Sequence, residues 1–146
     1  MEDRLKSLLI RGNIYFEKAG TEELEMKQHS EKWSKKEILG HLIDSAINNI
    51  KRFTEVQFEP KPFRIHRYNQ NELVKANNYQ GADKNHLIEM WHSLNRHIFY
   101  LIQLQTPETL DYEIILEDGR VYDLNYLIDD YISHLEHHLN QIMEVC

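Results

Sequence analysis

The stretch that decides the fold is residues 34–57, which reads SKKEILGHLIDSAINNIKRFTEVQ. It opens with Ser34 and Glu37, the S-x-x-E spacing of a capping box, in which each side chain accepts a hydrogen bond from the other residue's backbone N–H. Apolar residues then recur every three or four positions, which is the period of an α-helix with one buried face. We therefore predict a long amphipathic helix that begins at this capping box and ends near Gln57.

The same helical period appears in three further stretches of the chain. They are residues 1–19, 83–104 and 123–143. Gly20 and Pro107 follow the first two of them, as expected after helix ends, and Asp123 is a residue that caps the start of the last. A shorter helix is expected around residues 70–77. Four long helices with short connections are typical of a four-helix bundle.

One passage of the chain is strand-like. Residues 112–116 show the two-residue period of a β-strand, and Asp118-Gly119 follows as a two-residue hairpin turn. Two strands alone are barely stable in water, so we expect this hairpin to pack against the helices. The sequence thus predicts an all-α four-helix bundle, one domain over residues 1–146, with a small β-hairpin before the last helix.

Composition and charge argue against several classes of protein. The 146-residue chain has a net charge of −7, and residues 106–146 alone carry −9, which disfavours binding to nucleic acid. No apolar run approaches the roughly 18 residues of a membrane span, and the first residues lack a signal-peptide layout. The single cysteine, Cys146, excludes an internal disulfide framework and a cysteine-based zinc site. We therefore expect a cytoplasmic protein with a small-molecule partner and no nucleic-acid or membrane partner.

Histidine is unusually frequent, with nine copies in the chain. His134 and His138 lie four residues apart in the last predicted helix, on one face and about 5.4 Å apart along its axis. With this spacing a single helix can offer two imidazoles to one metal ion. His137 competes for the pairing, because residues three apart also converge. Since Leu135 and Leu139 mark the buried stripe, and His138 lies nearer its middle, we favour His138.

A third histidine, His41, lies in an apolar stripe of the second long helix. Taken alone, it is more simply explained as a polar core residue with a hydrogen-bond partner. Together with His134 and His138 it forms a set on two helices, and bundle cores build metal sites from facing helices. Cys146, at the end of the chain, is a weak additional ligand candidate. The residues by themselves leave both a metal centre and ordinary polar core residues open.

Two segments carry a family resemblance. Residues 32–45, KWSKKEILGHLIDS, followed by Asn49, Arg52 and Phe53, resemble the second-helix signature of the DinB-like superfamily. Residues 130–142, DYISHLEHHLNQI, resemble the last-helix signature of the same family, particularly of its YfiT-like branch. The resemblance spans nearly the whole chain, with matching element order.

The resemblance implies an up-down-down-up four-helix bundle, usually a homodimer, that binds a divalent metal through three histidines. In this chain those histidines match His41, His134 and His138. Members of the family are described as metal-dependent hydrolases, and some as transferases that join a low-molecular-weight thiol to an electrophile. The resemblance therefore implies a small-molecule substrate, with a thiol as one candidate.

Three neutral histidines suit zinc and leave an open coordination position, and nickel, iron and manganese also bind imidazole. The open position can activate a water for hydrolysis or hold a thiol as the nucleophilic thiolate. The sequence does not choose between these nucleophiles, nor does it establish that the protein is an enzyme. The alternative is a non-catalytic binding or stress-response module in which the metal only ties two helices together.

Other polar residues could support or line such a site. Asp44 lies three residues after His41 and could accept a hydrogen bond from its imidazole, although a solvent-facing carboxylate is the simpler interpretation. Asp130 and Glu136 are expected at the surface. The basic loop within residues 58–67 could attract an anionic substrate, with ordinary solvation as the simpler account. Three amides on bundle helices are candidates for pocket polar groups: Asn48, Asn95 and Gln141.

Overall fold

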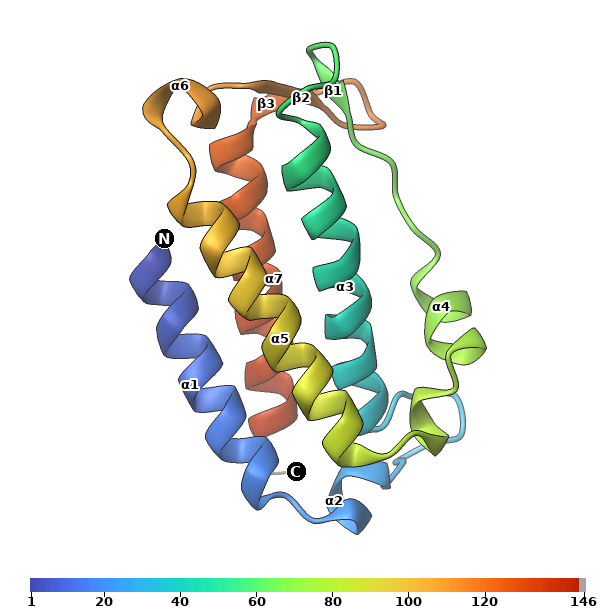
Figure 1. The fold of residues 1–146 in the computed structure, drawn as a ribbon. Coiled ribbons are helices and arrows are strands. Elements are labelled where there is room, and N and C mark those ends of the chain that lie inside the picture. Colours follow the sequence, from blue (N-terminus) through green and yellow to red (C-terminus); the bar gives the residue numbers. More distant parts are fainter. Residues whose placement is uncertain (145–146) are drawn as a thin grey trace.

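The structure, a computed structural model, describes residues 1–144 and contains a four-helix bundle (Figure 1). The bundle helices are α1 (Glu2–Lys18), α3 (Lys35–Glu55), α5 (Lys84–Gln103) and α7 (Leu124–Met143). In Figure 1, α1 and α7 run downward, whereas α3 and α5 both run upward. The predicted all-α bundle and its up-down-down-up topology are therefore confirmed.

Short helices lie in the connections between the long ones. They are α2 (Thr21–Glu25), α4 (Gln70–Ala76), the 3-10 turn η1 (Tyr79–Gly81) and α6 (Pro107–Leu110). Because α3 and α5 point the same way, the chain must travel back along the bundle between them. Residues 56–83, here called the return segment, do this along the outer side of α3 (Figure 1).

A small sheet covers one end of the bundle. It consists of β1 (Phe63–Arg64), β2 (Glu113–Ile115) and β3 (Val121–Asp123). The predicted hairpin is confirmed, since β2 and β3 pair antiparallel with Ile114 opposite Tyr122. The sheet also has a third strand, because β1 pairs parallel to β2 and places Phe63 opposite Ile114. No sequence pattern predicted β1, which is two residues long and lies in the return segment.

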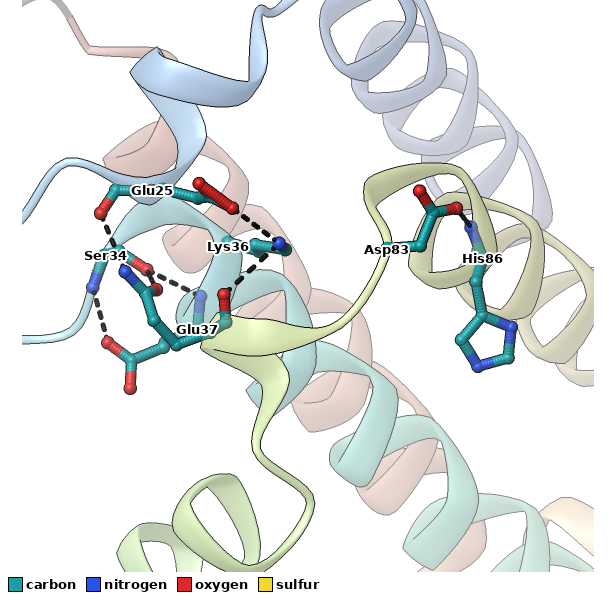
Figure 2. A network of polar contacts seen from close by, with 7 residues as sticks. Glu25, Ser34, Lys36, Glu37, Asp83 and His86 are labelled. Carbon is teal, nitrogen blue, oxygen red and sulfur yellow. Dashed lines mark hydrogen bonds and ion pairs between the residues drawn. The ribbon is translucent and has the colours of Figure 1, made fainter.

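The helix starts follow from local sequence. At the start of α3, the Ser34 side chain accepts from the backbone N–H of Glu37 at 3.1 Å, and the Glu37 carboxylate accepts from the N–H of Ser34 at 3.0 Å. Figure 2 shows this capping box and the equivalent bond at α5, where the Asp83 carboxylate accepts from the N–H of His86 at 3.0 Å. Asp123 caps α7 in the same way. Both predicted caps, at Ser34 and Asp123, are thus confirmed, and Asp83 is a further cap that the structure adds.

The base of α3 is tied to two other segments by a buried lysine. Lys36 is only 3% exposed, and its ammonium contacts the Glu25 carboxylate at 3.0 Å and the Gln80 carbonyl at 3.2 Å (Figure 2). These contacts connect α2 and the return segment to the bundle. The partner carboxylate matters because a buried charge without one is strongly destabilising.

The apolar faces of the four long helices meet in one core, in which Trp91 and Phe16 pack edge to face. Gly40 permits a close approach on α3, because a Cβ there would lie 2.1 Å from the Tyr79 ring. The return segment therefore docks closely beside His41. None of the helices within residues 1–144 combines the length and apolar character needed to cross a membrane.

Candidate metal centre

Three histidines from two helices meet inside the bundle. His41 comes from the first half of α3, and His134 and His138 come from the C-terminal half of α7. The Nε2 atoms of His41 and His134 are 3.1 Å apart, and one ring nitrogen from each of the three histidines lies within 4.8 Å of the others. His137 is exposed and stands outside this cluster, as the buried stripe of α7 predicts.

The spacing of these nitrogens fits a metal ion. Ligand atoms placed 2.0–2.1 Å from a tetrahedral zinc lie about 3.3 Å from one another, close to the separation of the two Nε2 atoms. Within residues 1–144 no carboxylate or thiol joins the cluster. Cys146, the weak ligand candidate, lies outside the described residues. The donor set is therefore three imidazoles, which suits several divalent metals.

Burial keeps these imidazoles uncharged. His41 is 1% exposed, and desolvation, followed by the nearby His134 and His138, lowers its pKa to about 3. Burial and the neighbouring imidazoles likewise lower the pKa of His134 to about 4 and shift the pKa of His138 downward. At neutral pH each imidazole therefore keeps a free lone pair, which is the form that binds metals.

The cluster does not satisfy its own hydrogen bonds. The Nδ1 atoms of His41 and His134 are buried and have no partner among residues 1–144. His138 differs, because its Nδ1 lies 2.9 Å from the Gln141 amide oxygen, which fixes the ring and leaves Nε2 as the acceptor. Gln141, predicted as a pocket amide, thus contacts a candidate ligand directly. Burying these two Nδ1 atoms without partners is costly. The nitrogens that converge are instead the Nε2 atoms of His41 and His134, whose lone pairs a bound ion would use.

Asp44 does not lie where the simpler interpretation placed it. The expectation of a solvent-facing carboxylate is wrong, since Asp44 is 3% exposed beneath the return segment. Its Oδ1 accepts from the Tyr79 hydroxyl at 2.6 Å, and Oδ2 has no partner in the described part of the chain. Burial raises the pKa of the Asp44 carboxyl. No hydrogen bond joins Asp44 to His41 within residues 1–144. The hydrogen bond that Asp44 does make, with Tyr79, holds the return segment against α3.

The other predicted amides make ordinary hydrogen bonds. Asn48 donates to the carbonyl of Asp44, and Asn95 is fully buried between the Trp91 carbonyl and the Tyr131 hydroxyl. Neither approaches the histidine cluster through a hydrogen bond in the described residues. These two residues are therefore part of the scaffold.

Two clefts flank the histidines. One, of about 490 Å³, is lined by Trp33 and Gln141, which contact His41 and His138 respectively. The other, of about 290 Å³, lies between α3, α7 and the return segment, and His134 itself forms part of its wall. We call this second space the His134 cleft. A small molecule in this cleft would lie beside His134, a candidate metal ligand.

The His134 cleft also contains residues that the sequence did not single out as a site. Ser45, Asn49 and Arg52 line it from α3, and their helical spacing from His41 was the available signal. Of the predicted basic loop, Arg67 reaches the cleft, whereas Lys61 lies over the Tyr112 ring at 4.3 Å. Asp130, expected at the surface, is exposed and borders the same cleft.

Comparisons with known proteins agree with this fold. A family model described as the DinB superfamily matches residues 13–142. The structure of YfiT from Bacillus subtilis, described as a probable metal-dependent hydrolase with an unusual four-helix bundle topology, superposes with a TM-score of 0.80. That match has 19% sequence identity and covers 97% of this chain and 83% of YfiT.

A second solved structure is a mycothiol-dependent maleylpyruvate isomerase, with a TM-score of 0.73 and 14% identity. The match covers 99% of this chain and 61% of the isomerase, so the bundle corresponds to only part of that protein. A comparison with curated protein sequences found no match. At these identities the structural likeness establishes the fold.

Proposed function

The chain belongs to the DinB superfamily, and from this premise we propose that residues 1–146 form one domain that binds a divalent metal ion through His41, His134 and His138. We propose further that the bound metal serves an enzymatic reaction on a small molecule. The observation that carries the proposal is the convergence of three uncharged imidazoles beside an open cleft. The binding energy of an ion at the converging nitrogens would offset the cost of burying the two Nδ1 atoms that lack partners in the described residues.

Residues around the histidines would orient the metal ligands and keep them uncharged. Gln141 fixes the tautomer and orientation of His138, and the Trp33 ring, which lines the other cleft, lies 5.0 Å from the His41 ring. Burial holds all three imidazoles neutral, so protons do not compete with the metal near pH 7. When bound, such an ion supplies Lewis-acid chemistry that favours the deprotonated form of a water or a thiol.

Of the two chemistries, we favour transfer of a thiol to an electrophile over hydrolysis. A thiol has a pKa near 8.5, so it needs no general base once a cation is close, whereas hydrolytic zinc sites commonly place a carboxylate beside the metal ligands. No carboxylate belongs to the cluster within residues 1–144, and Asp130, which borders the His134 cleft, has no hydrogen bond to a histidine of the cluster in this part of the chain. The mycothiol dependence of the isomerase with the same fold is consistent with this preference.

The non-catalytic alternative also has an observation in its favour. An ion held by His41 and His134 would join α3 to α7, and such a crosslink would stabilise the bundle whether or not a reaction follows. This role requires no ligand position facing a cleft. The two proposals therefore differ in whether an added thiol changes the spectrum of the bound metal.

Zinc or nickel as the metal, and a homodimer as the assembly, stay predictions of the resemblance. Ile10 and Ile14 on α1 are about half exposed, at 52% and 49%, and offer an apolar face for a second copy. The three histidines of the cluster lie on α3 and α7 and not on α1, so the metal proposal does not depend on the dimer.

The decisive test is elemental analysis of protein purified without chelators, together with two histidine variants. We expect about one divalent ion per chain in the wild type, and a metal affinity more than 100-fold weaker in His134→Ala, since losing a ligand should exceed the 10–100-fold effect of losing an outer partner. His137→Ala is the matched control, because His137 neighbours the cluster without joining it. We expect it to keep the metal and the turnover of a thiol with an electrophile.

The proposal fails if the wild type is metal-free and gains nothing from added zinc or nickel. It also fails if His137→Ala and His134→Ala lose metal equally. Metal binding without any change in the spectrum of cobalt-substituted protein on adding a thiol would favour the non-catalytic alternative.

A further inference from the structure

The His134 cleft has a polar wall at a distance from the histidines. Asn49 and Arg52 lie on α3, on the same helix face as His41, and form this wall together with Tyr68 of the return segment. His134 lies at the other end of the cleft on α7. The cleft is therefore a single space with candidate metal chemistry at one end and a guanidinium at the other.

Arg52 is held in place by neutral groups. One terminal nitrogen donates to the carbonyl oxygen of His66, the other lies 3.5 Å from the Asn49 amide oxygen, and the guanidinium lies over the Tyr68 ring at 5.5 Å. No carboxylate within residues 1–144 comes within ion-pair distance of it. A half-buried arginine positioned in this way keeps N–H donors free for an anion.

The second arginine of the cleft is different. Arg67 is 83% exposed and already pairs with Glu117 at 3.4 Å. It lies in the rim formed by the return segment. The two arginines thus carry the same charge in the same cleft, but Arg52 alone is both enclosed and free of a carboxylate partner in the described residues.

The spacing along α3 sets the shape of a ligand that would use both ends. The guanidinium lies against Asn49, which is eight residues after His41 and thus about 12 Å further along the helix axis. The cleft volume of about 290 Å³ admits only a small molecule or a narrow extended one. A ligand reaching from Arg52 to His134 must therefore be elongated.

The negative charge of Asp130 favours a singly charged anion over a doubly charged one in the His134 cleft. Asp130 lies one helical turn before His134 and borders the cleft beyond ion-pair distance of Arg52, although their opposite charges still attract each other. Its carboxylate repels a second negative charge between the two ends, which disfavours a dianion such as a phosphate monoester. A single carboxylate matches the planar fork of Arg52.

We propose that the His134 cleft binds an elongated small molecule through a terminal carboxylate, which pairs with Arg52, while its other end lies at His134. The reactive role of the His134 end rests on the proposed function. The carboxylate subsite rests only on the cleft and on the contacts of Arg52, so the two can be tested separately.

The test compares two probes that differ in one group, 6-mercaptohexanoate and 6-mercaptohexanol. Their dissociation constants are measured by calorimetry or by NMR titration, for zinc-loaded full-length protein and for protein freed of metal by a chelator. We expect the acid to bind roughly ten- to a hundredfold more tightly than the alcohol, as for a charged hydrogen bond. This preference should be present with and without zinc.

Two variants with the same charge change decide the origin of the preference. Arg52→Gln should abolish it, and Arg67→Gln should keep it. A preference that survives in Arg52→Gln, or that falls equally in both variants, would overturn the proposal. If Arg52→Gln does not fold, Arg52→Lys decides, because lysine keeps the charge but loses the fork. In Arg52→Lys, a preference for the acid that is reduced at least threefold supports the proposal, and an unchanged preference contradicts it.

The outcomes for the two proposals remain distinct. Normal zinc binding without a preference for the acid would contradict the carboxylate subsite alone. A preference for the acid in protein that does not bind zinc would contradict the metal proposal alone. His134→Ala, measured free of metal, should keep the acid preference because Arg52 is unchanged.

Discussion

The bundle buries two groups of polar side chains that are built in opposite ways. Between α5 and α7, the Asn95 amide donates to the Trp91 carbonyl at 2.9 Å and accepts from the Tyr131 hydroxyl at 2.6 Å. Between α3 and α7, the histidine cluster leaves the Nδ1 atoms of His41 and His134 without partners in the described residues. The first group closes its hydrogen bonds within the protein, and the second does not.

This difference separates a pair that stabilises the fold from the cluster that we propose binds an ion. A buried polar atom without a partner does not by itself indicate a binding site, because the indole nitrogen of Trp91 is also buried without a partner among residues 1–144. Trp91, however, offers a single donor, whereas the histidines bring three acceptor-capable rings to one point. Convergence of several ring nitrogens on one point is therefore the informative feature.

The largest effect on stability is expected at the hydrogen bond between Asn95 and Tyr131. Tyr131→Phe removes the hydroxyl and leaves the Asn95 amide oxygen buried without its donor, so we expect a loss of about 1–3 kcal/mol in the free energy of unfolding. Zinc affinity should not change. Urea unfolding and zinc calorimetry measure the two quantities.

Tyr126→Phe is the matched control for that change. The Tyr126 ring stacks on Tyr122 at 3.9 Å, and its hydroxyl has no hydrogen bond within residues 1–144. We expect its stability to stay within about 0.5 kcal/mol of the wild type. Equal losses in the two variants, or a weaker zinc affinity in Tyr131→Phe, would show that the two polar groups are not independent.

A second change acts on the histidine cluster. Gln141→Ala removes the acceptor that orients His138, and we expect about tenfold weaker zinc binding with little change in stability, because Gln141 is exposed. Asn140→Ala is the control, since Asn140 is also exposed and contacts Arg11 instead. If both variants lose the same affinity, Gln141 does not position His138.

The smallest effect is expected at Asp44, which lies between the two extremes with one oxygen paired and the other not. Burial raises its pKa, so the folded protein holds this proton more tightly than the unfolded chain. The stability linked to it is fully present below the unfolded pKa and is lost as the pH rises through the raised value.

Asp44→Asn keeps the acceptor for the Tyr79 hydroxyl and removes the charge. We therefore expect the metal-free variant to be slightly more stable than the wild type at pH 7, with a gap that closes toward pH 4. Urea midpoints across this range measure it, with Glu89→Gln on the surface of α5 as the control. A variant less stable than the wild type at pH 7 would mean that the Asp44 charge has a favourable partner.

The sequence was most informative where the physics is local. The Ser34 capping box and the Asp83 and Asp123 caps join residues three positions apart, so they can be recognised without knowing the fold. The spacing of His134 and His138 is local in the same sense. Placing His41 opposite them required only that α3 and α7 face each other, which the bundle provides.

The sequence was least informative where the return segment decides the outcome. Asp44 is buried because Tyr79, thirty-five residues away, covers it, and Arg52 lines a cleft because Tyr68 and the His66 carbonyl close over it. β1 exists only because β2 lies beside it. Such contacts depend on where a long connection crosses a helix, which no local pattern encodes.

The parallel direction of α3 and α5 has a consequence for engineering. It obliges the chain to carry a long return segment, and this segment supplies one wall of the His134 cleft, whereas the histidines lie on the bundle helices α3 and α7. Exchanging residues 66–70 between related bundles should therefore alter which molecules enter without disturbing the histidines. A library randomised there would show whether this wall sets which small molecules bind beside the histidines.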